Sequence, residues 1–318
     1  MATQLPKLPD VERLSERHGG LISNRPWEGF GEFIIIRFLS FPNHPFTLQG
    51  TNTYLIGRGP SRLLIDTGEG RPVWSKSLQA TLASENASVK TALLTHWHPD
   101  HIQGVPDLVK LCPDVKVHKH QPDVGEQYDI TDGQVFSVEG ATLKAHSTPG
   151  HTGDHMVFVL EEEGAMFTGD NVLGHGTSVF DDLSVYLSTL AKMQEYFLRR
   201  DGPCRAYPGH GAVIDDGKAK IAEYIQHRQQ REEEVLHVLK HGVLVGKDEH
   251  ASSAQIEPKE LRAWTPIELV KIIYHDVPEN LHLPAAYGVT QVLKKLEGDG
   301  GVVRESEGKG EERFRVVV

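Results

Sequence analysis

The stretch His96-Trp97-His98-Pro99-Asp100-His101 places three imidazoles and a carboxylate within six consecutive positions. Neutral imidazole nitrogens and carboxylate oxygens are the usual protein ligands of zinc and of related divalent ions. The preceding residues 91–95 read TALLT, a short apolar run that is typical of a buried strand. The sequence therefore predicts a loop of metal ligands at the end of a strand.

Working outward, four more ligand-type side chains follow other apolar runs. His151 stands after Pro149-Gly150, Asp170 directly follows Gly169, and His210 directly follows Gly209. An earlier carboxylate, Asp66, comes at the end of the apolar residues 63–65. Glycine suits these places because the backbone must turn sharply to aim a side chain inward. A site for two metal ions needs more ligands than one loop can supply, and these segments offer them.

In this order, the five segments resemble the metallo-β-lactamase superfamily, the αββα hydrolases that include glyoxalase II. The resemblance covers about the first two thirds of the chain. It implies that one metal ion is held by His96, His98 and His151. It implies that the other is held by Asp100, His101 and His210, with Asp170 bridging the two. It also implies that Asp66 orients the ligands from behind, although a strand-end aspartate before Thr-Gly could simply close a turn.

Two cations ~3.5–4 Å apart would lower the pKa of a water between them from ~15.7 toward ~7. The resulting hydroxide can attack a carbonyl or phosphoryl group, and the second cation can stabilise the oxyanion and the leaving group. Asp100 is the predicted catalytic residue, since it lies beside the expected position of that water and can accept and return its proton. Zinc is the expected metal, although sites of this kind also accept Fe or Mn.

Other histidines have weaker assignments. His175, in Gly174-His175-Gly176 shortly after Asp170, is a candidate for substrate binding, and a plain surface loop is an equal alternative. Four further histidines are expected to be ordinary residues with no part in the site: His118, His120, His146 and His155. A purely structural zinc site is disfavoured, because such sites are closed and rich in cysteine.

The composition predicts a water-soluble globular protein inside the cell. The chain has 318 residues, with 33 Lys and Arg against 44 Asp and Glu, and a net charge of −11. This balance disfavours non-specific binding to nucleic acid, whose affinity comes from neutralising phosphates. Two cysteines are too few for a disulfide framework, and no apolar run approaches membrane-spanning length. Together with a polar N-terminus that lacks a secretory signal, this favours an intracellular, cytoplasmic protein without a membrane partner.

Periodicity predicts a mixed α/β fold. Strands are expected at residues 33–39, 53–56, 62–65, 91–95, 115–118, 142–145, 156–160 and 165–167. Helices are expected at residues 74–84, 105–111 and 182–199. Strands interleaved with helices support sheets covered by helices. The predicted fold is thus an αββα sandwich over residues 1–215, followed by a smaller domain over residues 216–318.

The smaller domain reads as a winged helix. Residues 218–240 form one long charged helix, Thr265-Pro266-Ile267-Glu268 is a capping box, and residues 284–296 form another amphipathic helix. Two short strands, 302–303 and 314–318, follow. Such modules often bind DNA, but acidic residues crowd this one: Glu297, Asp299, Glu305, Glu307, Glu311 and Glu312. We therefore expect a packing role or a role at the substrate mouth.

One branch of the superfamily resembles this chain most. The resemblance is carried by residues 45–53, 95–104, 169–182 and 265–279. The branch includes fungal hydrolases of aromatic polyketide pathways, the atrochrysone carboxyl acyl-carrier-protein thioesterases, and an animal single-strand endoribonuclease. The resemblance implies hydrolysis of a polyketide thioester on the acyl carrier protein of a non-reducing polyketide synthase. Single-strand RNA cleavage, a glyoxalase-II-like reaction and regulation through DNA binding are the alternatives.

Overall fold

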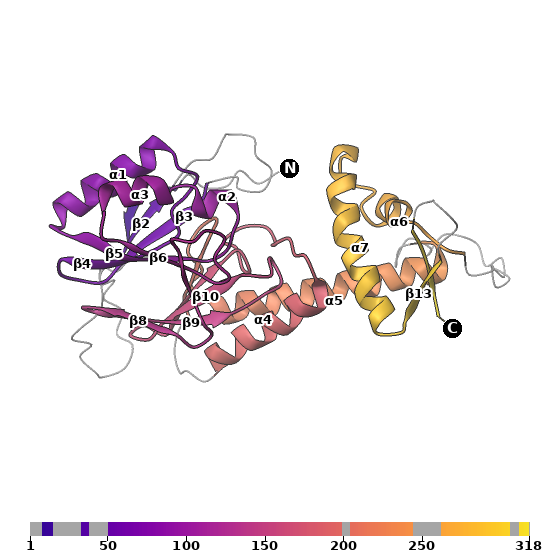
Figure 1. Ribbon diagram of the computed structural model, residues 1–318. Helices are drawn as coiled ribbons and strands as arrows, with labels where there is room; N and C mark the ends of the chain where they lie inside the picture. The colour runs from indigo at the N-terminus through magenta and orange to yellow at the C-terminus, as the bar shows by residue number, and fades with distance from the viewer. Residues whose placement is uncertain are drawn as a thin grey trace. The chain divides into compact units, whose positions relative to one another are not determined.

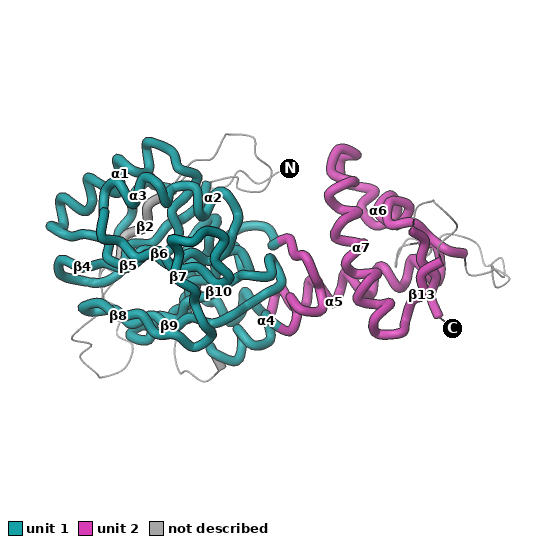
Figure 2. The backbone as a smooth tube through the Cα atoms, viewed as in Figure 1, with its two compact units in different colours: residues 1–178, 189–221 teal, residues 179–188, 222–318 magenta. Residues whose placement is uncertain are grey.

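A computed structural model describes residues 8–14, 33–37, 50–198, 204–243, 262–305 and 312–317. Some predicted positions lie outside these residues: 38–39, 45–49, Arg199, Glu307, Glu311 and Val318. Two compact units interleave along the chain, as Figure 2 shows. One combines Met1–Ser178 with Thr189–Ile221, and the other combines Val179–Ser188 with Ala222–Val318. The simple division after residue 215 stays a prediction.

The first unit contains two β-sheets. The seven-stranded sheet has the order β1-β2-β3-β4-β5-β6-β7. Its strands are Val11–Arg13, Phe33–Arg37, Asn52–Ile56, Ser61–Ile65, Ser88–Leu94, Lys116–Lys119 and Tyr128–Asp129. The five-stranded sheet has the order β12-β11-β10-β9-β8. Its strands, in that order, are Ala206–Pro208, Ala165–Gly169, Met156–Leu160, Ala141–Ser147 and Val135–Val138.

Apolar side chains bind these sheets into layers. Between the sheets lies one core cluster, with Leu63, Leu93, Phe158 and Phe167 among its fully buried members. A second cluster joins the outer face of the seven-stranded sheet to helices α1 (Pro72–Ser84) and α3 (Val105–Leu111). Figure 1 shows these helices above strands β4 and β5.

Helix α4 (Leu183–Leu198) supplies the fourth layer of the first unit from its Thr189–Leu198 part. The hydroxyl of Tyr196 lies 2.5 Å from Nδ1 of His146 on β9, and Thr189 Oγ1 donates to the carbonyl of Pro149 (2.6 Å). This helix therefore packs on the five-stranded sheet, and the predicted αββα sandwich is confirmed.

Several strands end at the same edge of the sandwich. Strands β4 and β5 run parallel, as do β11 and β12, so their carboxyl ends lie together. Strand β9 also ends at this edge, because Ser147 pairs with Met156 at the start of β10. The amide of Met156 donates to the carbonyl of Thr95 (2.8 Å), which ties the two sheets together there. The loops after these strands carry the predicted ligands.

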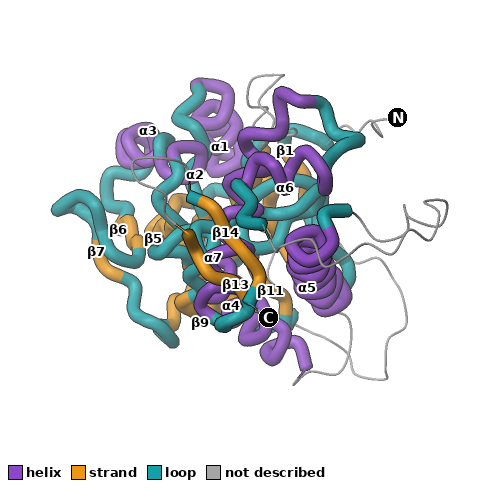
Figure 3. The backbone as a smooth tube through the Cα atoms, turned by 90° about the vertical axis from the view of Figure 1, so that its right-hand side faces the viewer, coloured by secondary structure: helices purple, strands orange, loops and turns teal. Residues whose placement is uncertain are grey.

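The second unit has the winged-helix order of elements. Most of helix α5 (Gly217–His241) belongs to it, followed by α6 (Pro266–Ile273), the short 3-10 helix η1 (Glu279–Leu281) and α7 (His282–Gly298). Strands β13 (Val302–Glu305) and β14 (Arg313–Val316) pair antiparallel, as Figure 3 shows. The predicted capping box is confirmed: the backbone amides of Thr265 and Glu268 each donate to the other residue's side chain. The predicted small winged-helix-like domain is thus present.

Short elements escaped the periodicity analysis. Strands β1, β7, β8 and β12, and the four-residue helix α2 (Pro99–Ile102), were not predicted. Among the described residues, no helix is both long and apolar enough to cross a membrane.

Candidate metal centre

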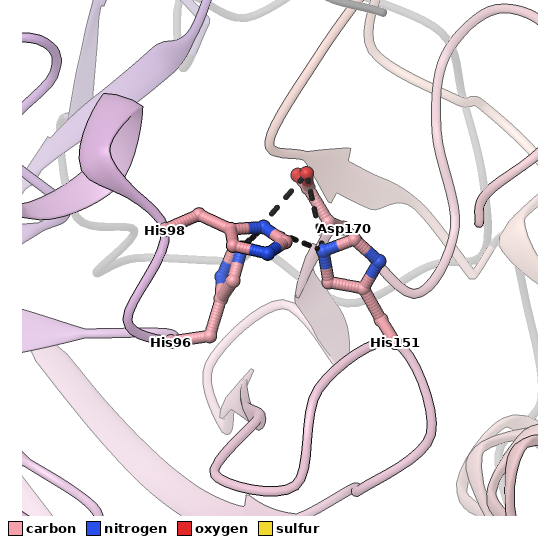
Figure 4. A group of neighbouring side chains, drawn as sticks. All are labelled: His96, His98, His151 and Asp170. Atoms are coloured by element: carbon pink, nitrogen blue, oxygen red, sulfur yellow. Dashed lines mark hydrogen bonds and ion pairs between the residues drawn. The ribbon is translucent and has the colours of Figure 1, made fainter. Parts of the chain in front are cut away.

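Four side chains from three loops form the first of two clusters. His96 and His98 follow β5, His151 follows β9, and Asp170 follows β11. Nδ1 of His98 lies 2.9 Å from Nε2 of His96 and 3.0 Å from Nε2 of His151. Figure 4 shows the three rings and the carboxylate of Asp170 pointing toward one another. One ion could contact a ligand atom from each of them, since all four atoms lie within 4.8 Å of one another.

Asp100, His101 and His210 form the second cluster. Asp100 and His101 belong to α2, and His210 follows β12. Oδ2 of Asp100 lies 3.4 Å from Nε2 of His101 and 3.3 Å from Nε2 of His210. Both imidazoles are buried, whereas the side chain of Asp100 is 20% exposed. The carboxylate is therefore the member of this cluster that solvent can reach.

Asp170 connects the two clusters. Its Oδ2 lies 3.7 Å from Nε2 of His151 and 3.1 Å from Nε2 of His210, while its Oδ1 lies 3.5 Å from Nε2 of His101. The structure thus brings together all seven predicted ligands, with the predicted bridging carboxylate between the two groups.

The outward ring nitrogens of three cluster histidines have protein partners. His96 Nδ1 lies 2.9 Å from Thr95 Oγ1, and His151 Nδ1 lies 3.3 Å from Ser178 Oγ. His210 Nδ1 lies 3.0 Å from the carbonyl of Gly50, to which it can only donate. Such contacts fix the ring orientation and tautomer of a metal-binding histidine. They leave Nε2 of these three rings turned toward the centre, whereas His98 faces it with Nδ1.

Asp66 lies behind the second cluster. Its Oδ2 is 2.8 Å from Nδ1 of His101, and its carboxylate also accepts bonds from the amide and hydroxyl of Thr95. Its backbone has a φ of 58°, a left-handed conformation that is uncommon outside glycine and is often found at functional sites. Asp66 therefore holds the loop after β5 and one imidazole at once, more than a turn-closing role requires.

The charges of the site favour a cation. Burial lowers the pKa of His96 well below its usual range, so its ring is neutral and offers a lone pair. Burial would also lower the pKa of His101 and His210, but the carboxylates of Asp100 and Asp170 outweigh it and raise the pKa of His210 to about 10. Without a metal ion, the protonated imidazoles of His101 and His210 thus neutralise the negative charge of the two carboxylates. A bound cation would take over that role.

Two buried atoms of the site have no hydrogen-bond partner of normal geometry within the described part of the chain: His101 Nε2 and Asp170 Oδ1. A buried polar atom without a partner costs about 1–3 kcal/mol, and both of these atoms face the candidate centre. Ligation of a cation would satisfy them, so the residues present fit a divalent metal.

Sequence reasoning missed three contributors. Thr51 donates from Oγ1 to Oδ2 of Asp100 (2.8 Å), and Ser178 contacts His151 as described above. His155, which was expected to have no part in the site, is fully buried with its Nε2 3.1 Å from the backbone nitrogen of Asp170. His155 lies only four residues after His151. That spacing was the one signal that could have placed it near the site.

His175 lies near the second cluster. Its imidazole is half-buried, and a Cβ added to Gly211 would lie 2.8 Å from its Cδ2. Its Nε2 has no hydrogen-bond partner among the described residues. The role in substrate binding stays a prediction.

Family models match both units. A model described as "Metallo-beta-lactamase superfamily" matches residues 46–220, and one described as "Beta-lactamase associated winged helix domain" matches residues 265–310.

Curated relatives match nearly the whole chain. An atrochrysone carboxyl ACP thioesterase of Aspergillus chevalieri is 43% identical over 99% of this chain and 92% of its own. The lactamase-like protein nscB of Neosartorya fischeri is 48% identical over 93% of this chain and 83% of its own. Among solved structures, a beta-lactamase domain protein from Burkholderia ambifaria superposes with a TM-score of 0.72 at 16% identity, covering 90% of this chain and 91% of its own. That last likeness concerns the fold alone.

Proposed function

This chain belongs to the metallo-β-lactamase superfamily, and from this membership we propose that it is a metal-dependent acyl-carrier-protein thioesterase. Its substrate would be an aromatic polyketide held as a thioester on the carrier protein of a non-reducing polyketide synthase. Its product would be the free acid, of the atrochrysone carboxylic acid type. The observation that carries this proposal is the joining of two ligand clusters by Asp170, in a chain that matches a curated thioesterase along nearly its whole length.

The proposed centre would hold two zinc ions, one with the ligands of each cluster, and Asp170 reaches side chains of both clusters. When bound, the cations supply a water of lowered pKa and an electrophile for the carbonyl oxygen. The ligand set is rich in imidazole and carboxylate, which also suits Fe or Mn.

Asp100 is the residue best placed to handle protons. Its carboxylate is partly exposed, and Thr51 Oγ1 donates to its Oδ2. Burial opposes its ionisation, but the adjacent imidazoles of His101 and His210 outweigh burial and hold its pKa below the usual range. Asp100 is therefore ionised at neutral pH. It can orient the attacking water by accepting a hydrogen bond from it, although a carboxylate of such low pKa binds the released proton only weakly.

A thioester suits this site. Its carbonyl is more electrophilic than that of an ester, and the thiolate leaving group needs little protonation. The site then mainly has to hold the carbonyl beside an oriented water. Good orientation of the two reactants alone can remove a large part of the activation barrier to hydrolysis. The partner that presents the acyl group would be the carrier protein.

The direct test uses the purified protein and a polyketide synthase whose carrier domain is loaded with its acyl chain. We expect release of the free acid, which stops when a chelator removes the metal and in the His96→Ala variant. His118→Ala is the matched control, because His118 is a half-buried histidine of β6 outside both clusters. Product release that survives both chelation and His96→Ala would defeat the proposal.

The same preparation separates the alternatives. Hydrolysis of a glutathione thioester in preference to the loaded carrier would favour a glyoxalase-II-like enzyme. Cleavage of a single-stranded RNA oligonucleotide at enzyme-like rates would favour an endoribonuclease. Either result would replace the proposed substrate while leaving the metal centre in place.

A further inference from the structure

His155 is a buried histidine close to the candidate metal centre that belongs to neither cluster. Its side chain is fully buried, and its ring centroid lies 5.2 Å from that of His96 and 5.9 Å from that of His151. It nevertheless has no ligand atom in the four-residue or the three-residue group. Its two ring nitrogens instead lie within hydrogen-bond distance of other groups of the protein.

The hydrogen bonds of His155 fix its tautomer. A backbone N–H can only donate, so Nε2, which lies 3.1 Å from the amide nitrogen of Asp170, must carry a lone pair. A neutral imidazole has one N–H, which then resides on Nδ1. Thr148 Oγ1 lies 3.0 Å from Nδ1 and can accept that hydrogen, whereas the side-chain amide nitrogen of Asn171, also 3.0 Å from Nδ1, cannot. The ring thus links Thr148 on one side to the backbone of Asp170 on the other.

The backbone around Asp170 is held from two more directions. Gly169 has a φ of 49°, and a Cβ added there would lie 2.6 Å from Nε2 of His155. This residue must be glycine for the ring to approach so closely. The carbonyl of Gly169 also accepts from the amide of Gly209 (2.7 Å), which precedes His210. The main chain that carries the carboxylate of Asp170 therefore has little freedom.

We propose that His155 is a positioning residue that fixes the bridging carboxylate of Asp170 by accepting a hydrogen bond from its backbone amide. This inference rests on the proposed metal centre. Asp170 is the described residue that reaches both clusters, so a displaced backbone would loosen both. Contacts behind the ligands of a metal site typically change its affinity for metal by about 10–100-fold when they are lost.

The test compares His155→Met with His155→Gln. Methionine fills the space without accepting a strong hydrogen bond, whereas the amide oxygen of glutamine can replace Nε2 as the acceptor. Each zinc-loaded protein is titrated with a colorimetric chelator. We expect His155→Met to bind zinc at least tenfold more weakly than the unaltered protein, and His155→Gln to recover most of that loss.

His146→Met is the matched control, because His146 is also buried, lies on β9 and belongs to neither cluster. We expect its zinc affinity to stay within twofold of the unaltered protein. If His155→Met retains zinc equally well, the inference is overturned.

If His155→Met does not fold, Thr148→Val decides, since it removes the acceptor for Nδ1 without changing side-chain size. A zinc affinity several-fold lower supports the inference, and an unchanged affinity overturns it. The outcome is separable from that of the proposed function. An unaltered protein that binds zinc tightly but hydrolyses no thioester defeats the function and leaves the role of His155 standing.

Discussion

Gly209 lies where any side chain would enter the candidate metal centre. A Cβ added to it would be 2.2 Å from Oδ1 of Asp170 and 3.0 Å from Cε1 of His101. Gly209→Ala should therefore displace the bridging carboxylate and lower thioester hydrolysis at least tenfold, as loss of a supporting contact does in other metal sites. Steady-state kinetics and zinc titration would measure both effects.

Gly153→Ala is the control for this prediction. Gly153 lies in the loop of His151, but a Cβ there would meet nothing within 4 Å. Its hydrolysis rate should match that of the unaltered protein. Equal rates for Gly209→Ala and Gly153→Ala would contradict the assignment of Asp170.

Lys119 is a fully buried lysine at the end of β6, with its side chain 1% exposed. Its Nζ lies 2.7 Å from Oδ2 of Asp154, a buried residue of the loop that carries His151. Lys119→Met would leave the carboxylate of Asp154 buried without its cation. Breaking a buried pair in this way costs about 3–5 kcal/mol.

Urea unfolding checks the prediction for Lys119. Lys90→Met is the control, because the pair of Lys90 with Asp114 is exposed and should be worth less than about 1 kcal/mol. A loss for Lys119→Met no larger than that for Lys90→Met would show that this pair does not stabilise the loop.

At the scale of elements, helix α6 depends on its cap. Thr265 Oγ1 accepts from the amide of Glu268 (3.3 Å), and Oε2 of Glu268 accepts from the amide of Thr265 (2.8 Å). Thr265→Ala should lower the free energy of unfolding by about 1 kcal/mol. Thr290→Ala, within α7, should change it by less than about 0.5 kcal/mol, because its hydroxyl bonds only to the carbonyl of Ala286 in the same helix and alanine is the better helix former. Chemical denaturation measures the free energy of unfolding of both variants. Equal losses for Thr265→Ala and Thr290→Ala would show that the cap does not stabilise α6.

Element length decided what the sequence could predict. Strand β10, with five residues, and helix α3, with seven, were predicted with the bounds found in the structure, because each is a continuous run rich in apolar residues. Strand β12 has three residues and β7 has two, too few for a pattern to emerge. The predicted ligands meet because the strands before them end at one edge. His155 could not be assigned, since its role depends on a backbone amide that no sequence motif marks.

At the scale of the whole molecule, charge separates an enzyme from a DNA-binding protein. The chain carries a net charge of −11, and the arginines of β13 and β14 pair with carboxylates. Lys295 of α7 likewise pairs with Glu232 and Asp299. These described cations already have carboxylate partners and the net charge is negative, so we expect no retardation of duplex DNA at physiological salt. A salt-dependent shift in an electrophoretic mobility assay would contradict this reading of the winged-helix unit.

The proposed function depends most on a centre of two cations that Asp170 would join. Elemental analysis of protein purified without chelators, run beside a thioester hydrolysis assay of the same sample, tests this most directly. We expect about two divalent ions per chain, and hydrolysis that falls with their removal and returns with their replacement. Metal-free protein that hydrolyses the thioester at an undiminished rate would contradict it.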